Sequence, residues 1–216
     1  MECFTLDDLT RCMAPHAPIY SWRKPAYQYV ALTNLHRAWD KSHRRALDVG
    51  GGTGLLAYTI KSLFGLDHIV SIDVENRYLP SLDIETAVYD GCTLPFPDKS
   101  FDCVILFNVL HHVPTPLRLP LLRECRRVAG TGPLYIKDHL SEGLFDDARL
   151  AALDLIGNLP FNGMVSACYL RAEDWRTLTS GAGYACEIVS DGEYRHGVER
   201  VIFPNRLETS MKWRPI

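Results

Sequence analysis

The stretch Leu47-Asp48-Val49-Gly50-Gly51-Gly52-Thr53-Gly54 decides the fold, because an apolar run ends there and a helical segment begins. Glycines at such a junction let the backbone come close to a ligand, and the start of the helix offers free N–H groups. Four glycines in five positions also cost chain entropy without adding side-chain packing. The pattern therefore predicts a ligand-binding loop rather than an empty turn between a strand and a helix.

Two classes of ligand fit this loop. Residues 52–57 match the G-x-G-x-x-G/A pattern of dinucleotide sites, whereas the D-x-G-x-G-x-G pattern is met by Asp48, Gly50, Gly52 and Gly54. The acid at Asp48 would repel a pyrophosphate but would tolerate a ligand with a positive sulfonium and an ammonium group. The second class is favoured, and it is compatible with Asp48 being a buried acid that supports the loop.

Two more acids follow at the ends of predicted strands. Asp73 can accept hydrogen bonds from both hydroxyls of a ribose, in either ligand class. Asp90, followed by Gly91, can accept a hydrogen bond from an adenine amine. The alternative for Asp73 is an ordinary surface acid at a strand end.

From residue 44 onward, short apolar runs alternate with helical segments, which is typical of βαβ units on a mostly parallel sheet. The predicted strands are residues 45–50, 68–73, 85–90, 101–107, 134–138, 185–190 and 199–203. The predicted helices are residues 26–39, 53–64, 116–128, 146–156 and 173–179. The 116–128 helix is expected to present a solvated face with Arg123, Arg126 and Arg127.

Composition excludes several other classes. The 216 residues carry a net charge of −3, whereas a dedicated nucleic-acid binder usually has a basic excess. No run of about 18 uncharged apolar residues predicts a membrane span, and the acidic start of the chain lacks the basic region of a secretory signal. Seven scattered cysteines without a C-x-x-C pair indicate free thiols in a reducing cytoplasm and no zinc site. The sequence makes no prediction about the oligomeric state.

A longer pattern follows the third predicted strand. It reads Asp90-Gly91-Cys92-Thr93-Leu94-Pro95-Phe96-Pro97-Asp98-Lys99-Ser100-Phe101-Asp102 and continues with Asn108-Val109-Leu110-His111-His112-Val113. Together with the glycine loop and Asp73, it resembles the class I S-adenosylmethionine-dependent methyltransferases. The nearest branch is the small-molecule group that includes quinone-biosynthesis C-methyltransferases. The resemblance is strong over residues 44–139 and loose over the C-terminal strands.

This resemblance implies a Rossmann-like, doubly wound α/β fold with seven strands in the order 3-2-1-4-5-7-6 and strand 7 antiparallel. S-adenosyl-L-methionine would lie across the carboxyl ends of strands 1 to 4. Beside Asp48, its amino-acid part would then lie over the three glycines Gly50, Gly52 and Gly54. Asp73 would hold the ribose, Asp90 and Gly91 would face the adenine, and Asn108 would lie near the methionine end.

The implied reaction is the in-line displacement of a methyl group from the sulfonium to a small-molecule acceptor. Positioning can contribute roughly 7–11 kcal/mol to such a step, and a base is needed only where the acceptor must lose a proton. The candidates for acid–base work are His111, in the pair with His112, and His139, which ends the run Lys137-Asp138-His139 and could instead bind the acceptor. Each can instead be structural. Strand alternation places Asp138 on the face opposite Lys137 and His139.

The ends of the chain match no pattern, so the quinone substrate class is not carried over from the resemblance. A single domain is predicted, with a helical cap at residues 1–43, a cofactor-binding core at 44–139, a lid at 140–171, and a helix and strands at 172–216. Residues 1–43 and 140–171 should together cover the carboxyl edge of the sheet, because the connection leaving strand 5 emerges on the ligand side. The aromatic candidates for an acceptor pocket, or for the core, are Trp22, Tyr27, Tyr135, Phe145, Phe161 and Tyr169.

Three alternatives are weaker. A short-chain dehydrogenase needs a Tyr-x-x-x-Lys pair, but Tyr20 and Lys24 form the only one and precede the glycine loop. A protein that binds S-adenosylmethionine without consuming it would share every cofactor motif. An arsenite-type methyltransferase would need a thiolate cluster, for which Cys3, Cys12 and Cys168 lie in the unmatched segments.

Overall fold

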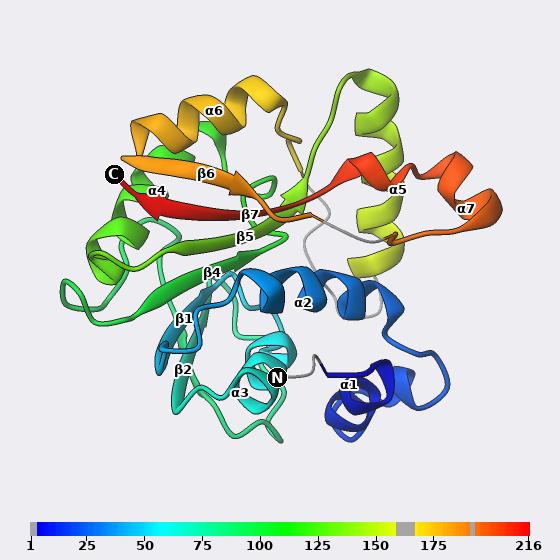
Figure 1. The fold of residues 1–216 in the computed structure, drawn as a ribbon, viewed down its shortest axis with the longest axis horizontal. Coiled ribbons are helices and arrows are strands. Elements are labelled where there is room, and N and C mark those ends of the chain that lie inside the picture. Colours follow the sequence, from blue (N-terminus) through cyan, green and yellow to red (C-terminus); the bar gives the residue numbers. More distant parts are fainter. Residues whose placement is uncertain (1–3, 159–166, 191–192) are drawn as a thin grey trace.

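A seven-stranded sheet forms the centre of the molecule in a computed structural model that describes residues 4–158, 167–190 and 193–216 (Figure 1). Its order is β3-β2-β1-β4-β5-β7-β6, and β7 runs antiparallel to both neighbours, which confirms the topology implied by the resemblance. The strands are β1 (Arg45–Val49), β2 (His68–Asp73), β3 (Glu85–Val88), β4 (Cys103–Phe107), β5 (Leu134–His139), β6 (Tyr184–Ile188) and β7 (Glu208–Pro215).

Helices cover both faces of the sheet (Figure 1). One face packs against α1 (Leu6–Met13), α2 (Ala26–Ala38) and α3 (Leu55–Phe64) through a core that includes Leu32, Ile60 and Ile105. The other face packs against α4 (Thr115–Ala129) and α6 (Ala172–Gly181). Along β4, Val104 and Leu106 join the second core while Cys103 and Ile105 join the first, as expected for a strand buried on both sides.

The segment before β1 is part of this packing. Leu32 and Leu35 of α2 are buried against the sheet, and the Trp39 ring stacks on Tyr135 with 4.8 Å between ring centroids. Tyr135 therefore belongs to the core. Residues 4–43 thus pack mainly on one face of the sheet, so the expectation that they cover its carboxyl edge is wrong for most of this segment. Tyr27, in the first turn of α2, comes close to the end of β5, where Lys137 donates a hydrogen bond to the Tyr27 hydroxyl.

The last predicted strand is wrong. Residues 197–202 form a short helix, α7 (Gly197–Ile202), and the strand that inserts between β5 and β6 is β7. Val198, Val201 and Ile202 have the i, i+3, i+4 spacing of a helix, and all three are exposed. The β7 sequence is rich in polar residues, so its apolar signal is confined to Met211 and Trp213, which alternate on one face.

The remaining elements lie around the carboxyl ends of the parallel strands. They are α5 (Leu144–Asn158), α7 and the short 3-10 helices η1 (Pro18–Ser21) and η3 (Asn205–Leu207). The helix predicted at 146–156 is confirmed as α5, and Phe161 and Met164 of the expected lid lie outside the described residues. Within the described ranges, no helix is long and apolar enough to cross a membrane.

Candidate cofactor and acceptor site

One side of the glycine loop packs against the sheet, and the other side is an open surface. Gly50, Gly52 and Gly54 all have positive φ values, between 58° and 76°, which side chains rarely tolerate. A Cβ at Gly50 would lie 2.6 Å from a Val109 methyl, and one at Gly51 would overlap the Ser71 hydroxyl. A Cβ at Gly52 would meet nothing within 4 Å. The loop therefore packs closely on the sheet and leaves its Gly52 side open to a ligand.

Asp48 lies beneath this loop rather than beside the open side. It is buried, and its carboxylate accepts a 2.8 Å hydrogen bond from the Ser71 hydroxyl. Burial raises the pKa of Asp48 to about 7, assisted by the nearby charge of Asp73 and opposed by the Ser71 hydrogen bond. Gly51 covers the pair, because any larger residue would collide with both side chains. The geometry matches the alternative role considered for Asp48, that of a buried acid that supports the loop.

Asp73 ends β2 and contacts the loop directly. Its Oδ2 accepts a 2.7 Å hydrogen bond from the Gly52 amide, and its Oδ1 accepts one from the Glu75 amide at 3.1 Å. Arg77 donates to the same carboxylate at 3.3 Å. In the sequence, the only signal for Arg77 is its place four residues after the acid. Asp73 is thus part of the loop's support and not an isolated surface acid.

Asp90 and Gly91 lie in the next loop along the same edge. The Asp90 carboxylate is exposed and accepts hydrogen bonds from the amides of Cys92 and Thr93, at 2.8 and 2.7 Å. Gly91 has a φ of 82°, and a Cβ there would approach Val74, the residue after Asp73, to 3.3 Å. The two loops are therefore neighbours.

The Asp90 loop is also tied to α4. Arg127 donates hydrogen bonds to the carbonyls of Leu94 and Phe96, and Glu124 accepts one from the Leu94 amide. The expected solvated role of Arg127 is wrong, because the loop places backbone carbonyls within reach of its guanidinium group.

A buried group of charged residues lies at the ends of β4 and β5. Lys137 Nζ donates to the Asn108 side-chain oxygen and to Glu208, at 2.6 Å each, and to the Tyr27 hydroxyl. Arg195 also donates to Glu208. We refer to these five residues as the Lys137 cluster. Asn108 adopts a positive φ of 57°, and its neighbour Val109 lies against Gly50, so the cluster begins next to the glycine loop.

Glu208 and Arg195 could not be found from the sequence. Glu208 reaches the cluster only because β7 pairs antiparallel with β5 and sets it opposite His139. Nothing in a polar strand start or in the turn before α7 indicates that pairing in advance.

His139 lies between two carboxylates. Its Nδ1 is 3.1 Å from Glu208, in an ion pair that is not aligned as a hydrogen bond, and its Nε2 is 3.4 Å from Asp154. Burial lowers the pKa of His139, but the interactions with Glu208 and Asp154 together outweigh burial and raise the pKa to about 9. The raised pKa favours the protonated form of His139 at neutral pH, and a protonated ring does not accept a proton.

His111 is held by Asp138, on the other face of β5 as alternation predicted. The two side chains are 2.5 Å apart, and both are fully buried. Burial tends to raise the pKa of Asp138, but His111 and His139 hold it well below its usual range, so Asp138 is ionised. The ring centroids of His111 and His139 are 4.8 Å apart, so the structure brings both predicted acid–base candidates together.

The other aromatic residues predicted for the acceptor pocket or the core lie in different parts of the molecule. Tyr27 and Tyr169 lie at the site, the latter stacked on His111, whereas Trp22 and Phe145 are exposed and Phe161 lies outside the described residues. The dehydrogenase pair is not assembled for catalysis: the Tyr20 hydroxyl accepts from Gln28, and Lys24 is an exposed residue paired with Asp7.

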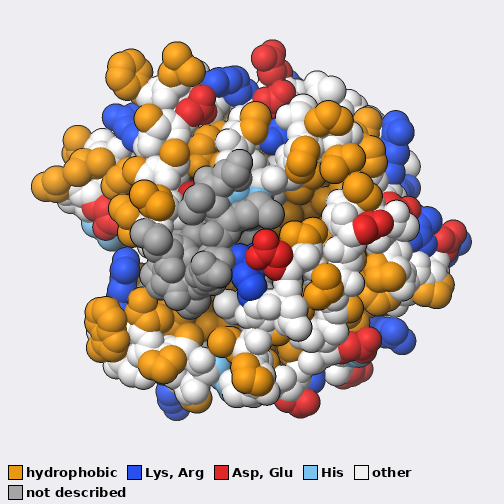
Figure 2. Space-filling model, turned by 180° about the vertical axis from the view of Figure 1, so that it is seen from behind, with side chains coloured by type: hydrophobic (Ala, Val, Ile, Leu, Met, Phe, Trp, Pro, Cys, Tyr) orange, Lys and Arg blue, Asp and Glu red, His pale blue; other side chains and the backbone are white. Residues whose placement is uncertain are grey.

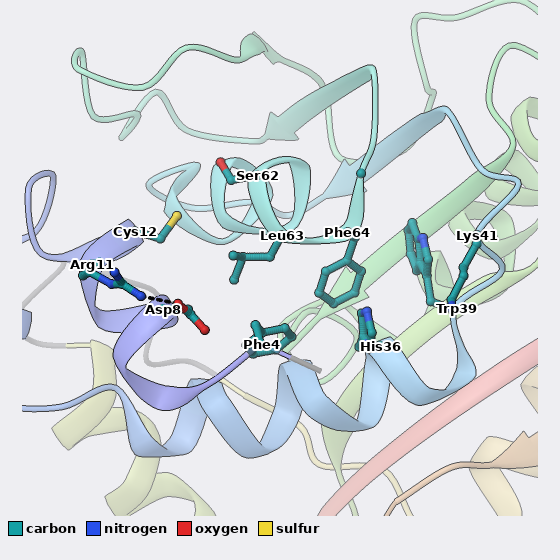
Figure 3. Close-up of a pocket in the computed structure, with 11 residues that line it drawn as sticks. Phe4, Asp8, Arg11, Cys12, His36, Trp39, Lys41, Ser62, Leu63 and Phe64 are labelled. Atoms are coloured by element: carbon teal, nitrogen blue, oxygen red, sulfur yellow. Dashed lines mark hydrogen bonds and ion pairs between the residues drawn. The ribbon is translucent and has the colours of Figure 1, made fainter. Parts of the chain in front are cut away.

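A cavity of about 680 Å³ lies elsewhere, between α1, α2 and α3 (Figure 3). Phe4, His36 and Phe64 pack around it, and Arg11 and Lys41 lie at its margin. Its residues at 39–41 and 62–65 immediately precede β1 and β2, so it lies toward the amino ends of the strands. It is therefore separate from the glycine loop and the Lys137 cluster.

Part of the chain is similar in sequence to known methyltransferases. Residues 47–136 match a family described as a methyltransferase domain. A ubiquinone/menaquinone biosynthesis C-methyltransferase of Francisella tularensis is 27% identical over 163 residues, covering 63% of this chain and 65% of that protein. The match thus spans slightly less than two thirds of the relative.

Two solved structures share the fold. A SAM-dependent methyltransferase from Archaeoglobus fulgidus superimposes with a TM-score of 0.63 at 15% identity, over 90% of this chain and 96% of that one. Human N-acetylserotonin methyltransferase, solved in complex with SAM, gives 0.60 at 18% identity, over 98% of this chain and 56% of that one.

Proposed function

Because residues 47–136 match a family described as a methyltransferase domain, we propose that this protein transfers a methyl group from S-adenosylmethionine to a small molecule. The observation that carries the proposal is the open side of Gly52, whose amide is held by Asp73 at the carboxyl edge of the sheet. This is the edge at which ligands bind in open α/β sheets. The relatives' names support the reaction class, and the fold of the SAM-bound human enzyme supports the cofactor.

The cofactor would follow the loops in order along this edge. Its amino-acid part would lie over Gly50, Gly52 and Gly54, with its ribose hydroxyls on Asp73 and its adenine between Asp90 and Gly91. Asn108 would lie near the methionine end. Asp48 would act from below, by supporting the loop through Ser71 rather than by touching the cofactor.

The acceptor would bind beyond Asn108, between the first turn of α2 and α5. Exposed apolar residues gather on α5 and α7: Leu144, Phe145, Leu155, Ile156, Val198, Val201 and Ile202. In Figure 2, which views the molecule from behind, hydrophobic side chains line this edge at the left. An apolar rim around a charged floor suits an aromatic small molecule with one or two polar groups, and the quinone methyltransferase among the relatives is in keeping with that class.

Catalysis would rest mainly on holding the acceptor in line with the methyl group, since the sulfonium is already activated. His139 is positively charged at neutral pH, so its proposed role is to bind an anionic or polar group of the acceptor rather than to remove a proton. His111 remains the second candidate for acid–base work, because Asp138 fixes its ring.

Calorimetry with the full chain tests the proposal. S-adenosylmethionine and S-adenosylhomocysteine should both bind with one site per chain, and NAD should show no measurable heat of binding. Release of S-adenosylhomocysteine in the presence of a panel of quinols and phenols then tests transfer. Binding of NAD without binding of S-adenosylmethionine would overturn the assignment, whereas cofactor binding with no release across the panel would favour a protein that retains the cofactor.

A further inference from the structure

Three potential metal ligands converge around His111, at one side of the site described above. They are His111 and His112, in the turn after β4, and Asp154 of α5. One nitrogen of each imidazole and one oxygen of the carboxylate lie within 4.8 Å of one another. His111 and Asp154 are buried, and His112 is partly buried. None of the motifs discussed above uses this grouping.

The hydrogen bonds of Asp138 determine which nitrogen of His111 faces the group. Asp138 accepts hydrogen bonds from the Leu110 amide at 2.9 Å and from the His139 amide at 2.7 Å, so it acts as an acceptor. His111 Nδ1 must then be the donor in the 2.5 Å contact with Asp138. In the neutral ring this leaves a lone pair on Nε2.

That lone pair points toward another electron-rich atom. His111 Nε2 lies 3.5 Å from Asp154 Oδ2, and it is fully buried without a hydrogen-bond partner. A nitrogen lone pair facing a carboxylate oxygen is unfavourable unless a cation lies between them. The cation can be a proton on Nε2 or a metal ion.

The surroundings favour the metal ion, because both buried ligands are held by outer partners. Asp138 orients His111, and the Tyr169 hydroxyl donates to Asp154 Oδ2 at 2.5 Å. The Tyr169 ring also stacks on His111, at 5.6 Å between centroids and 23° between planes. Histidine ligands of metals usually donate their second N–H to a carboxylate in this way, and ligating carboxylates are themselves hydrogen-bonded.

We propose that His111, His112 and Asp154 bind a divalent transition-metal ion, and that Zn²⁺ is the best match. Imidazole nitrogen and carboxylate oxygen suit this ion, and three protein ligands leave a coordination position open to water or a solute. Bonds of about 2.0–2.2 Å place tetrahedral ligands roughly 3.3–3.6 Å apart. The 3.5 Å between His111 Nε2 and Asp154 Oδ2 already meets that spacing, and His112 needs to close by about 1 Å.

Metal retention tests the site without any methyl acceptor or cofactor, so its outcome is independent of the proposed function. The full chain is stripped with a chelator, dialysed against Zn²⁺, freed of excess ion and measured by mass spectrometry of the metal. Wild type should retain one equivalent. Co²⁺ at the same site should give visible d–d absorption that Zn²⁺ abolishes in competition.

The variants His112→Ala and Asp154→Asn should each weaken Zn²⁺ binding at least about 100-fold, and Tyr169→Phe by about 10- to 100-fold, as expected for an outer partner. His196→Ala is the matched control, because His196 is exposed and paired only locally with Glu193 among the described contacts. It should bind like wild type. Far-ultraviolet circular dichroism of each variant checks that the fold is retained.

Failure of wild type to retain metal would overturn the proposal. The group would then be an ion-pair network in which Asp154 faces both His111 and His139. Equal Zn²⁺ affinity in wild type, His112→Ala and Asp154→Asn would also overturn it, since the metal would then bind elsewhere.

Discussion

At the residue scale, Asp48 is an acid of β1 that lies in the core beneath the glycine loop. It is buried under Gly51, and its only described hydrogen bond comes from Ser71. Such an acid is accepted in the core because it can remain protonated. The consequence is a stability that depends on pH near neutrality.

We expect Asp48→Asn to change that dependence. The folded-state pKa of Asp48, about 7, lies above the unfolded value of 3.8, so the folded state binds more protons between the two. Wild-type stability should therefore fall as pH rises from 4 to 8, by up to about 4 kcal/mol relative to Asp48→Asn. Urea unfolding of both proteins at pH 4, 6 and 8 measures the difference. A difference that is constant with pH would show that Asp48 is ionised throughout.

His139 should make the stability of the protein depend on pH in a second range, at higher pH. Its folded-state pKa of about 9 lies above the usual 6.5, so the stabilisation from its charge is complete below pH 6.5 and is lost as pH rises through 9. His139→Gln should therefore be less stable than wild type by up to about 3 kcal/mol at pH 6, with the gap narrowing by pH 9.5. Unfolding at these two pH values measures it. A gap that widens with pH would mean that His139 is neutral in the folded protein.

A substitution at Asp73 should weaken binding of the cofactor. Asp73→Ala removes a charged acceptor for two ribose hydroxyls, and hydrogen bonds to charged groups contribute about 1.5–3 kcal/mol. The dissociation constant of S-adenosylhomocysteine should rise roughly 10- to 100-fold in calorimetry. Glu75→Ala, an exposed acid two residues further on, is the control and should leave it unchanged. A normal affinity in Asp73→Ala would remove this residue from the ribose.

At the element scale, the connection from β5 to α6 is unusual because it contains an additional helix, α5, that a simple alternation of strands and helices does not need. Its two ends meet, because the Ser141 amide donates to the Leu170 carbonyl at 3.0 Å. Between them, α5 sends Asp154 toward the two histidines and pairs Asp146 with Arg206. This arrangement supports the proposal that residues 140–171 form a lid over the acceptor.

Replacing residues 142–169 by a short Gly/Ser linker tests the lid. The closeness of residues 141 and 170 allows the replacement without moving β5 or α6. Binding of S-adenosylhomocysteine should change less than about threefold, because the glycine loop, Asp73 and Asp90 lie outside the segment. Release of S-adenosylhomocysteine with an accepted quinol or phenol should be abolished. Full turnover in the shortened chain would refute the lid.

At the scale of the whole molecule, β7 joins one of the two cores to the site. Met211 and Trp213 pack into one core, while Glu208 joins the Lys137 cluster on the opposite face. Trp213 is fully buried and contacts the rings of Trp175 and Tyr184. The stability of the sheet's antiparallel end should therefore depend on this side chain.

We expect Trp213→Ala to lower the free energy of unfolding by about 3–5 kcal/mol, the usual cost of removing a buried tryptophan. Trp22→Ala is the control, because Trp22 is 78% exposed and should change it by less than about 0.5 kcal/mol. Urea unfolding measures both. Similar values for the two variants would mean that the β7 core is not needed for the stability of the domain.

The sequence by itself determined the parallel half of the sheet, the glycine loop and the acids at 48, 73 and 90. These features depend on local patterns, namely apolar runs, glycines at positive φ and acids at strand ends. Each of these patterns can be recognised within a short stretch of sequence. The resemblance gave the place of the last strand in the sheet, but only the packing of distant elements shows which residues form β7, that Lys137 pairs with Glu208, and that Asp154 meets His111. Those contacts join residues 43 to 71 positions apart, and β7 is a polar-rich strand whose burial depends on its neighbours. Because such contacts form only when distant elements pack together, no local period or motif announces them.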